Sequence, residues 1–273
     1  MIPEVALRAQ QMLDDPDVHL GKLADVLGAD PVLSVRIARL ADSPLYGARG
    51  TALSLRQAVQ RLGIPETRRV VMTVAVMNAL PELPPPMSVH VFWRLGLGSA
   101  LIGRQLAEDI KFARPEQAYL ACLVHTIGEA TLAINRPQEF GKAFQNASKQ
   151  GLELHAALRQ TFGVGPAELT AHMLRLWGFP REICEAVEFY LDARAAPEQR
   201  LLASIVFAAD RMCRGLGLAP EESGEGAEDW PSQIAPELCE RFAEIGYPDP
   251  TDYLLVRLQF MTGVEELIAK TFG

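Results

Sequence analysis

Apolar positions along the chain recur at spacings of three and four residues, which is the period of an α-helix. The clearest stretch runs from Leu120 to Leu132, where small and apolar side chains surround a single imidazole, that of His125. This pattern predicts a buried amphipathic helix with the histidine inside it. Nowhere does the sequence show sustained two-residue alternation with β-branched enrichment. The sequence therefore predicts an all-α protein.

Proline, glycine and capping residues divide this pattern into separate helices. After a short first helix that ends near Leu13, the first part of the chain predicts helices over residues 19–27, 32–41, 55–62 and 65–80. The second part predicts helices over residues 88–106, 115–136, 137–149, 152–161, 166–177, 180–192 and 197–214. Asp30-Pro31 and Ser54 are expected to cap the second and third of these helices.

The segment from Pro81 to Pro86 holds four prolines and marks the best internal boundary. We expect a first helical lobe over about residues 1–80 and a second over about residues 87–214, which together form one domain. Residues 215–231 are acidic and rich in glycine, as expected of a loop. Residues 232–273 show apolar stripes and predict a C-terminal extension of two or three helices.

The composition indicates a soluble cytoplasmic protein. The hydrophobic fraction is 49%, the charged fraction is 22%, and the net charge of −8 disfavours binding to nucleic acid or to anionic membranes. The longest apolar run, residues 70–80, is too short to span a bilayer. The four cysteines are scattered, which predicts free thiols rather than a zinc site or disulfides: Cys122, Cys184, Cys213 and Cys239.

Residues 22–41 superficially resemble a helix-turn-helix. The second helix of this stretch offers Arg36 and Arg39, but most of its other residues are apolar. A recognition helix must present polar side chains to base edges. We therefore expect no nucleic-acid partner.

The stretch from Ala29 to Val71 carries a recognisable motif. A helix ends in a pattern of leucine, serine, tyrosine and glycine, a loop with serine follows, and the next helix carries alanine, leucine and glycine. The matching residues are Leu40, Ser43, Tyr46, Gly47, Ser54, Ala58, Leu62 and Gly63, with Asp42 where the pattern has asparagine. Further matches follow in order along the chain at residues 92–93, 124–128, 176–180 and 208–211.

These motifs resemble the HD-related output domain, usually called HDOD, over roughly residues 15–214. The resemblance implies an all-α fold related to the HD phosphohydrolases, with an HD-like second lobe. It also implies a role in bacterial signalling, usually without a demonstrated catalytic activity.

The resemblance also shows which metal-ligand positions of the HD phosphohydrolases are changed here. Leu95 and Pro166 stand where histidines are expected, and Thr126 stands where the aspartate of the His-Asp pair belongs. Phe189-Tyr190 replaces a later imidazole pair. His125 and Asp210 remain, and two ligands hold a hydrolytic divalent metal poorly. We therefore expect no metal, no cofactor and no catalysis, with His125, Thr126 and Asp210 as remnant positions of the site.

Two interpretations of the remaining polar residues stay open. In the first, His125 is a core histidine that is hydrogen-bonded to Asp210 or to a backbone carbonyl, as buried polar groups require. In the second, a rearranged metal site uses His125, Glu129, His155, His172 and Asp210. Glu129 lies four residues after His125 and would share its helix face.

Three functional hypotheses follow. The first is a non-catalytic signalling module that binds a protein partner or a small ligand. The second is a metal-dependent phosphohydrolase or phosphodiesterase with an altered ligand set. The third is a nucleotide-binding sensor without turnover, in which Glu129, Arg94 and Arg104 are candidate ligand contacts.

Overall fold

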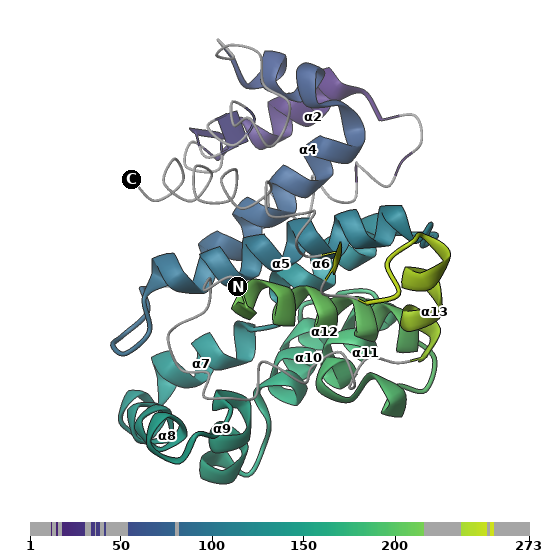
Figure 1. The fold of residues 1–273 in the computed structure, drawn as a ribbon. Coiled ribbons are helices and arrows are strands. Elements are labelled where there is room, and N and C mark those ends of the chain that lie inside the picture. Colours follow the sequence, from purple (N-terminus) through teal and green to yellow (C-terminus); the bar gives the residue numbers. More distant parts are fainter. Residues whose placement is uncertain are drawn as a thin grey trace. The chain divides into compact units, whose positions relative to one another are not determined.

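The computed structural model describes residues 12, 15, 18–30, 34–35, 37–38, 41, 54–79, 82–215, 236–249 and 252–253. These residues form helices joined by turns and short connections, and they contain no strand (Figure 1). The all-α prediction is therefore confirmed. The chain divides into two compact units, residues 1–81 with 262–273 and residues 82–261.

In the first unit, α2 (Leu20–Leu27) packs against α4 (Leu55–Ala79). The N-cap of α2 is His19, whose Nδ1 accepts a hydrogen bond from the Gly21 amide at 3.2 Å. The predicted cap at Ser54 is confirmed, because its hydroxyl accepts from the Gln57 amide at 3.2 Å.

The helix α4 is interrupted where the sequence predicts an end. Gly63 has φ 71° and ψ −178°, a conformation that no helix interior adopts and that glycine tolerates best. Two helical segments thus meet at this residue, and Pro65 lies in the first turn of the second one. The separate predictions for residues 55–62 and 65–80 are confirmed in this sense.

Several expectations fall on residues outside the described ranges. These are the first helix ending near Leu13, the motif at residues 42–47, the acidic loop from residue 216 onward, and most of the tail. Of the predicted helix 32–41, residues 34, 35, 37, 38 and 41 are described and are helical, and the Ser34 amide donates to the Asp30 carbonyl at 2.9 Å. One helix of the tail is described, α13.

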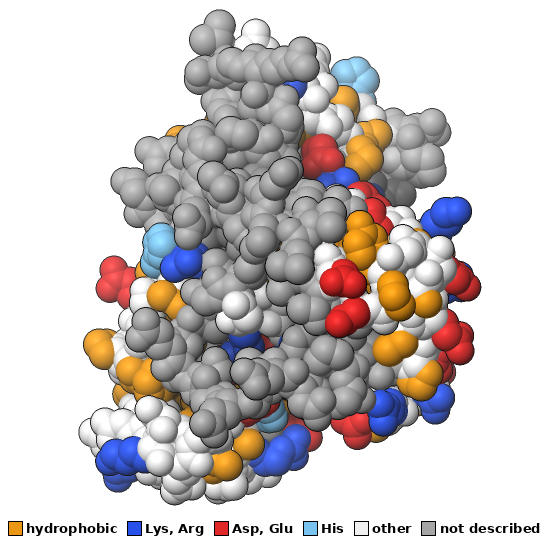
Figure 2. All heavy atoms as spheres, viewed as in Figure 1, with side chains coloured by type: hydrophobic (Ala, Val, Ile, Leu, Met, Phe, Trp, Pro, Cys, Tyr) orange, Lys and Arg blue, Asp and Glu red, His pale blue; other side chains and the backbone are white. Residues whose placement is uncertain are grey.

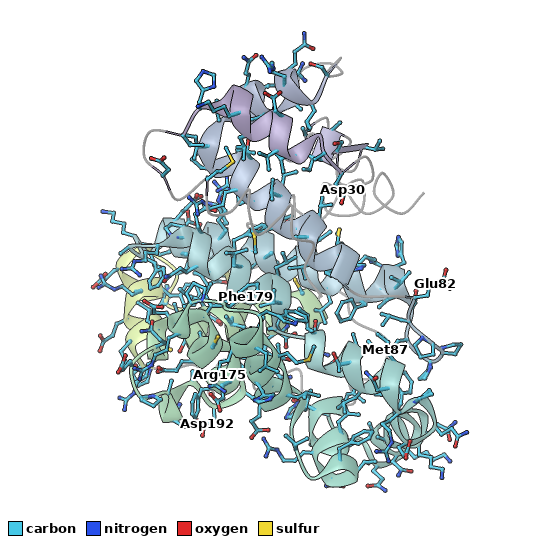
Figure 3. The ribbon with its side chains drawn as sticks, turned by 180° about the vertical axis from the view of Figure 1, so that it is seen from behind. Asp30, Glu82, Met87, Arg175, Phe179 and Asp192 are labelled. Atoms are coloured by element: carbon cyan, nitrogen blue, oxygen red, sulfur yellow. The ribbon has the colours of Figure 1, made fainter. Side chains whose placement is uncertain are left out.

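In the second unit, residues 82–88 form the proline-rich connector, with Glu82 and Met87 labelled near its two ends in Figure 3. Ser88 then caps the first long helix, as its hydroxyl accepts from the Val91 amide at 3.5 Å. The helices that follow are α5 (Val89–Asp109), α6 (Pro115–Val124), α7 (Ile127–Asn135), α8 (Pro137–Gln150), α9 (Leu154–Phe162), α10 (Pro166–Leu176), α11 (Arg181–Phe189), the 3-10 helix η2 (Tyr190–Ala195), α12 (Arg200–Gly215) and α13 (Pro236–Glu244).

The helix α12 is the central element of this unit, since it packs against α5, α6, α11 and η2. Residues 202–213 of α12 are all buried, and most of them are apolar. The core around α12 and α5 includes the large buried side chains of Trp93, Tyr119 and Phe207. Polar side chains within α12 are therefore held in an apolar environment, where they require partners.

The predicted continuous helix over residues 115–136 is wrong at one point, because α6 ends at Val124 and α7 begins at Ile127. His125 and Thr126 form a turn between the two helices. The Glu129 amide donates to the Thr126 carbonyl, and the Thr170 hydroxyl of α10 lies 3.2 Å from the carbonyl oxygen of His125. The Thr170 hydroxyl thus satisfies the His125 carbonyl, which in a continuous helix would accept a hydrogen bond from a backbone amide.

Close packing of α7 on α10 supports this turn. The Gly128 amide donates to the Thr170 hydroxyl at 2.8 Å. A Cβ atom at Gly128 would lie 2.2 Å from the Pro166 carbonyl oxygen, so only glycine permits this approach. The turn therefore depends on a glycine in α7 and a threonine in α10.

Candidate functional site

His125 and Asp210 meet in the core of the second unit. Nε2 of His125 lies 3.0 Å from Oδ1 of Asp210, and both side chains are 1% exposed or less. Nδ1 of His125 lies 2.5 Å from the Cys122 carbonyl oxygen. Both ring nitrogens of His125 therefore face oxygen atoms of the protein.

Asp210 also receives a guanidinium from its own helix. Nε of Arg214 lies 3.0 Å from Oδ1 and 2.9 Å from Oδ2 of Asp210, one helical turn away. Burial by itself raises the pKa of Asp210, but the charge of Arg214 and the hydrogen bond from His125 outweigh it and hold the pKa well below its usual range. Asp210 is thus an ionised carboxylate, with both oxygens engaged by Arg214 and one of them also by His125.

A second ion pair lies beside the first. Nη1 and Nη2 of Arg211 lie 2.8 Å and 2.7 Å from the two carboxylate oxygens of Glu153, and Nδ1 of His155 lies 2.9 Å from Oε2 of the same group. Burial raises the pKa of Glu153, but the hydrogen bonds from His155 and Arg211 outweigh it and lower the pKa to about 2. The carboxylate remains charged at neutral pH.

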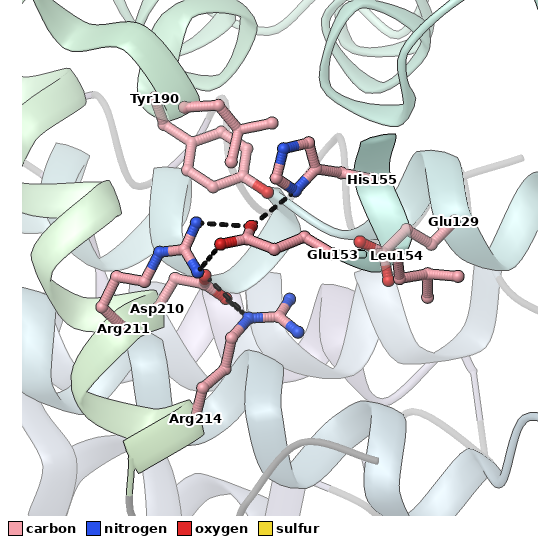
Figure 4. Close-up of a pocket in the computed structure, with 9 residues that line it drawn as sticks. Glu129, Glu153, Leu154, His155, Tyr190, Asp210, Arg211 and Arg214 are labelled. Atoms are coloured by element: carbon pink, nitrogen blue, oxygen red, sulfur yellow. Dashed lines mark hydrogen bonds and ion pairs between the residues drawn. The ribbon is translucent and has the colours of Figure 1, made fainter. Parts of the chain in front are cut away.

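Both ion pairs line one cavity (Figure 4). Its free volume is about 20 Å³, which suffices for about one water molecule. The cavity is lined by Glu129, Glu153, Leu154, His155, Tyr190, Leu191, Asp210, Arg211 and Arg214.

Two buried polar side chains on this cavity have no hydrogen-bond partner among the described residues. They are Glu129, 5% exposed, and Tyr190, 2% exposed. Burial raises the pKa of Glu129, while the nearby charge of Arg214 opposes this rise. Burial likewise raises the pKa of Tyr190, and the charge of Asp210 adds to it. The Glu129 carboxyl and the Tyr190 hydroxyl are therefore groups that a bound molecule could engage.

The structure brings some of the candidate residues together and leaves others apart. Glu129 and His155 line the cavity with Asp210, and His125 contacts Asp210 without lining the cavity. Thr126 is buried beside them, and its hydroxyl lacks a partner among the described residues. His172 is exposed on α10 and does not line the cavity.

The two arginines expected to contact a phosphate, Arg94 and Arg104, do not line the cavity either. The guanidinium of Arg104 instead pairs with Glu108 at 2.8 Å and approaches Glu116 at 3.9 Å. The cations at the site are Arg211 and Arg214, which the sequence interpretation missed. Arg214 lies four residues after Asp210 on a predicted helix, so helical spacing alone could have indicated this pair.

The residues present do not fit the divalent metal of the HD phosphohydrolases. Within the part of the chain that the structure describes, no group of three or more His, Cys, Asp or Glu side chains could hold a metal ion. Leu95 is buried and apolar, and both oxygens of Asp210 already accept hydrogen bonds from His125 and Arg214. A hydrolytic divalent metal requires several free oxygen or nitrogen ligands that converge on one point.

The all-α fold, with its buried contact between His125 and Asp210, is of the HD-like helical class. The model of the HDOD domain family matches residues 1–193, which is more than half of the chain. The chain therefore belongs to the HDOD family.

Solved structures agree with this assignment. An HDOD domain protein of unknown function from Geobacter sulfurreducens is 26% identical, with a TM-score of 0.84 over 100% of this chain and 93% of that one. A protein of Shewanella amazonensis SB2B, which its name proposes to be a phosphohydrolase, is 22% identical, with a TM-score of 0.76 over 100% and 94%. A protein of Marinobacter aquaeolei VT8, which its name proposes to act in signal transduction, is 21% identical, with a TM-score of 0.75 over 98% and 59%. The last two show the fold alone.

A curated relative from Treponema pallidum (strain Nichols), an uncharacterized protein, is 22% identical over 216 residues. The match covers 76% of this chain and 40% of the relative. This chain thus matches less than half of that relative's length.

The described surface carries charges of both signs. On the face seen in Figure 2, basic and acidic side chains of the described residues are interspersed. Among those residues, no helix has both the length and the apolar character that crossing a membrane requires.

Proposed function

We propose that this chain is a non-catalytic regulatory module of bacterial signal transduction, which acts by binding a protein partner or a small ligand in the cytoplasm. The single observation that carries the proposal is the contact between Arg214 and Asp210. In this contact a guanidinium of the protein supplies the positive charge that an HD phosphohydrolase would take from a metal ion.

The physical argument rests on charge and on geometry. A buried carboxylate requires a compensating cation and hydrogen bonds to both oxygens. Arg214 and His125 supply both to Asp210 without any added ion. A divalent metal bound to Asp210 would have to displace Arg214, and its guanidinium, on a side chain that is 17% exposed, would then lose its counter-charge.

Further support comes from the substituted positions and from the relatives. Leu95 and Thr126 cannot replace the imidazole and carboxylate ligands of the HD phosphohydrolases. Among the similar structures, one is named for signal transduction and another for phosphohydrolysis, so the names favour neither function. The chemistry of the Asp210 contacts favours the regulatory one. The free thiols Cys122, Cys184 and Cys213 are consistent with a reducing compartment.

A turnover assay tests the proposal. The purified chain is incubated with bis(p-nitrophenyl) phosphate in the presence of Mg²⁺, Mn²⁺ or Zn²⁺, with one metal in each assay. We expect no hydrolysis above that of His125→Ala, with His90→Ala as the matched control because His90 is exposed and does not line the cavity. Metal-dependent hydrolysis that disappears in His125→Ala and persists in His90→Ala would overturn the proposal.

A further inference from the structure

The contact between Arg211 and Glu153 has the form of an arginine that binds an oxyanion. Two parallel hydrogen bonds of 2.8 Å and 2.7 Å join the guanidinium fork to the carboxylate. The two residues are 58 positions apart, since Glu153 precedes α9 and Arg211 lies within α12. The Glu153 carboxylate thus meets Arg211 only through the tertiary structure, and it occupies the position that the oxyanion of a bound ligand would take.

Other donors face the same place from different elements. Nδ1 of His155 contacts the Glu153 carboxylate at 2.9 Å. Arg214 binds Asp210 through Nε, and its two terminal nitrogens have no partner among the described residues. The hydroxyl of Tyr190 also lines the cavity without a partner in that part of the chain. Figure 4 shows these side chains grouped around the Glu153 carboxylate.

We propose that this cavity is a binding site for a small tetrahedral dianion, with Arg211, Arg214, His155 and Tyr190 as donors, and that the Glu153 carboxylate occupies the site as an internal competitor. The inference rests on the proposed function, because it assigns a ligand class to a module that binds without turnover. Glu153 then acts as a plug that the ligand must displace.

The number of acceptor atoms favours a dianion of this kind over a second carboxylate. The Glu153 carboxylate is engaged by Arg211 and His155, while the terminal nitrogens of Arg214 make no contact with it. Arg211 and Arg214 are three residues apart on α12 and share one face. A phosphate or sulfate group has further oxygens and can accept from both guanidinium groups.

The charges around the site are compatible with an added anion. Asp210 is already neutralised by Arg214, and burial raises the pKa of Glu129, which favours its neutral form as a donor.

The size of the cavity explains why the Glu153 carboxylate must move out of the site before the anion binds. The cavity has about 20 Å³ of free volume, room for about one water, so a tetrahedral dianion fits only where the carboxylate now lies.

Calorimetric titration of the full chain with inorganic phosphate tests the proposal. Glu153→Ala is expected to bind phosphate roughly tenfold more tightly than the unmodified chain. Adding Arg211→Met to Glu153→Ala is expected to abolish the gain. Glu139→Ala is the matched control, since it removes a carboxylate from an exposed arginine pair and changes the net charge equally.

The proposal is overturned if Glu153→Ala binds phosphate no better than Glu139→Ala does. Glu153→Gln keeps the shape of the side chain and provides a second variant should the alanine variant not fold. A third readout uses the unmodified chain: phosphate should raise its melting temperature above that in chloride of equal ionic strength, and no increase there would count against the site. Hydrolysis of a phosphodiester would overturn the proposed function instead, so the two failures are distinguishable.

Discussion

The two arginine–carboxylate pairs on α12 differ in how they are built and in what they can do. Asp210 and Arg214 belong to one helix, one turn apart, and the carboxylate is 1% exposed. Arg211 reaches a carboxylate from a segment 58 residues away, and Glu153 is 28% exposed. The first pair lies within a single helix, so it does not depend on the placement of another segment. The second depends on the placement of another segment, so it can open while α12 stays intact.

The largest expected effect is on the Asp210–Arg214 pair, which we call the inner pair. Arg214→Met leaves the Asp210 carboxylate buried without its guanidinium partner, and we expect a loss of about 3–5 kcal/mol in the free energy of unfolding. Urea denaturation of the variant and of the unmodified chain measures this loss. A loss below about 1 kcal/mol would mean that Arg214 is not the counter-charge of Asp210.

The Arg211–Glu153 pair, which we call the outer pair, is expected to contribute less to the free energy of unfolding. Glu153→Gln keeps the shape of the side chain but removes its charge, and we expect a loss of about 1–3 kcal/mol at neutral pH, because hydrogen bonds to charged groups are in this range. The same urea titration measures it. A cost equal to that of Arg214→Met would contradict the distinction between a pair with a fully buried carboxylate and a pair with a partly exposed one.

Acid should weaken the outer pair without any mutation. The pKa of Glu153 is lowered from its ordinary value of 4.5 to about 2 in the folded chain. A group with a lowered folded pKa stabilises the fold above its unfolded pKa, and this stabilisation is lost as the pH falls from about 4.5 to 2.

Asp210 loses stabilisation in the same direction, since its pKa is also lowered. The contribution of Glu153 is therefore the difference between the unmodified chain and Glu153→Gln in melting temperature measured against pH. We expect this difference to shrink as the pH falls through that window. A difference that is constant from neutral pH to pH 2 would be inconsistent with the Arg211 contact.

The smallest expected effect is at the surface. Arg181 and Glu198 form an ion pair of 3.3 Å whose side chains are 79% and 61% exposed. Arg181→Ala should cost less than about 1 kcal/mol, because water and salt screen exposed pairs. Urea denaturation of this variant sets the baseline against which both α12 pairs are judged, and a loss comparable to that of Glu153→Gln would remove the contrast.

The helices and their caps could be predicted from the sequence because the interactions that define them are local. Ser54, Gly63 and Ser88 mark helix boundaries through contacts within three residues or through their own backbone conformation. The break at residues 125–126 was missed since it depends on Thr170, 45 positions from His125. The apolar periodicity continues across that turn and conceals it.

The candidate site shows the same division. The hydrogen bond between His125 and Asp210 was one of the open alternatives, because a buried imidazole requires a partner and the family pattern suggested which one. Arg214 could have been found from its spacing to Asp210. The pair of Arg211 with Glu153 could not, since its 58-residue separation is closed only by the packing of the helices that follow α7.

The central claim is that Arg214, and not a metal ion, neutralises Asp210. The most direct test is the metal content of the purified, untagged chain, measured by plasma mass spectrometry after incubation with Mg²⁺, Mn²⁺ or Zn²⁺ and removal of free ions. We predict a molar ratio of metal to protein near zero, unchanged in His125→Ala. A stoichiometric ratio that falls in His125→Ala would contradict the account and would place a metal at Asp210.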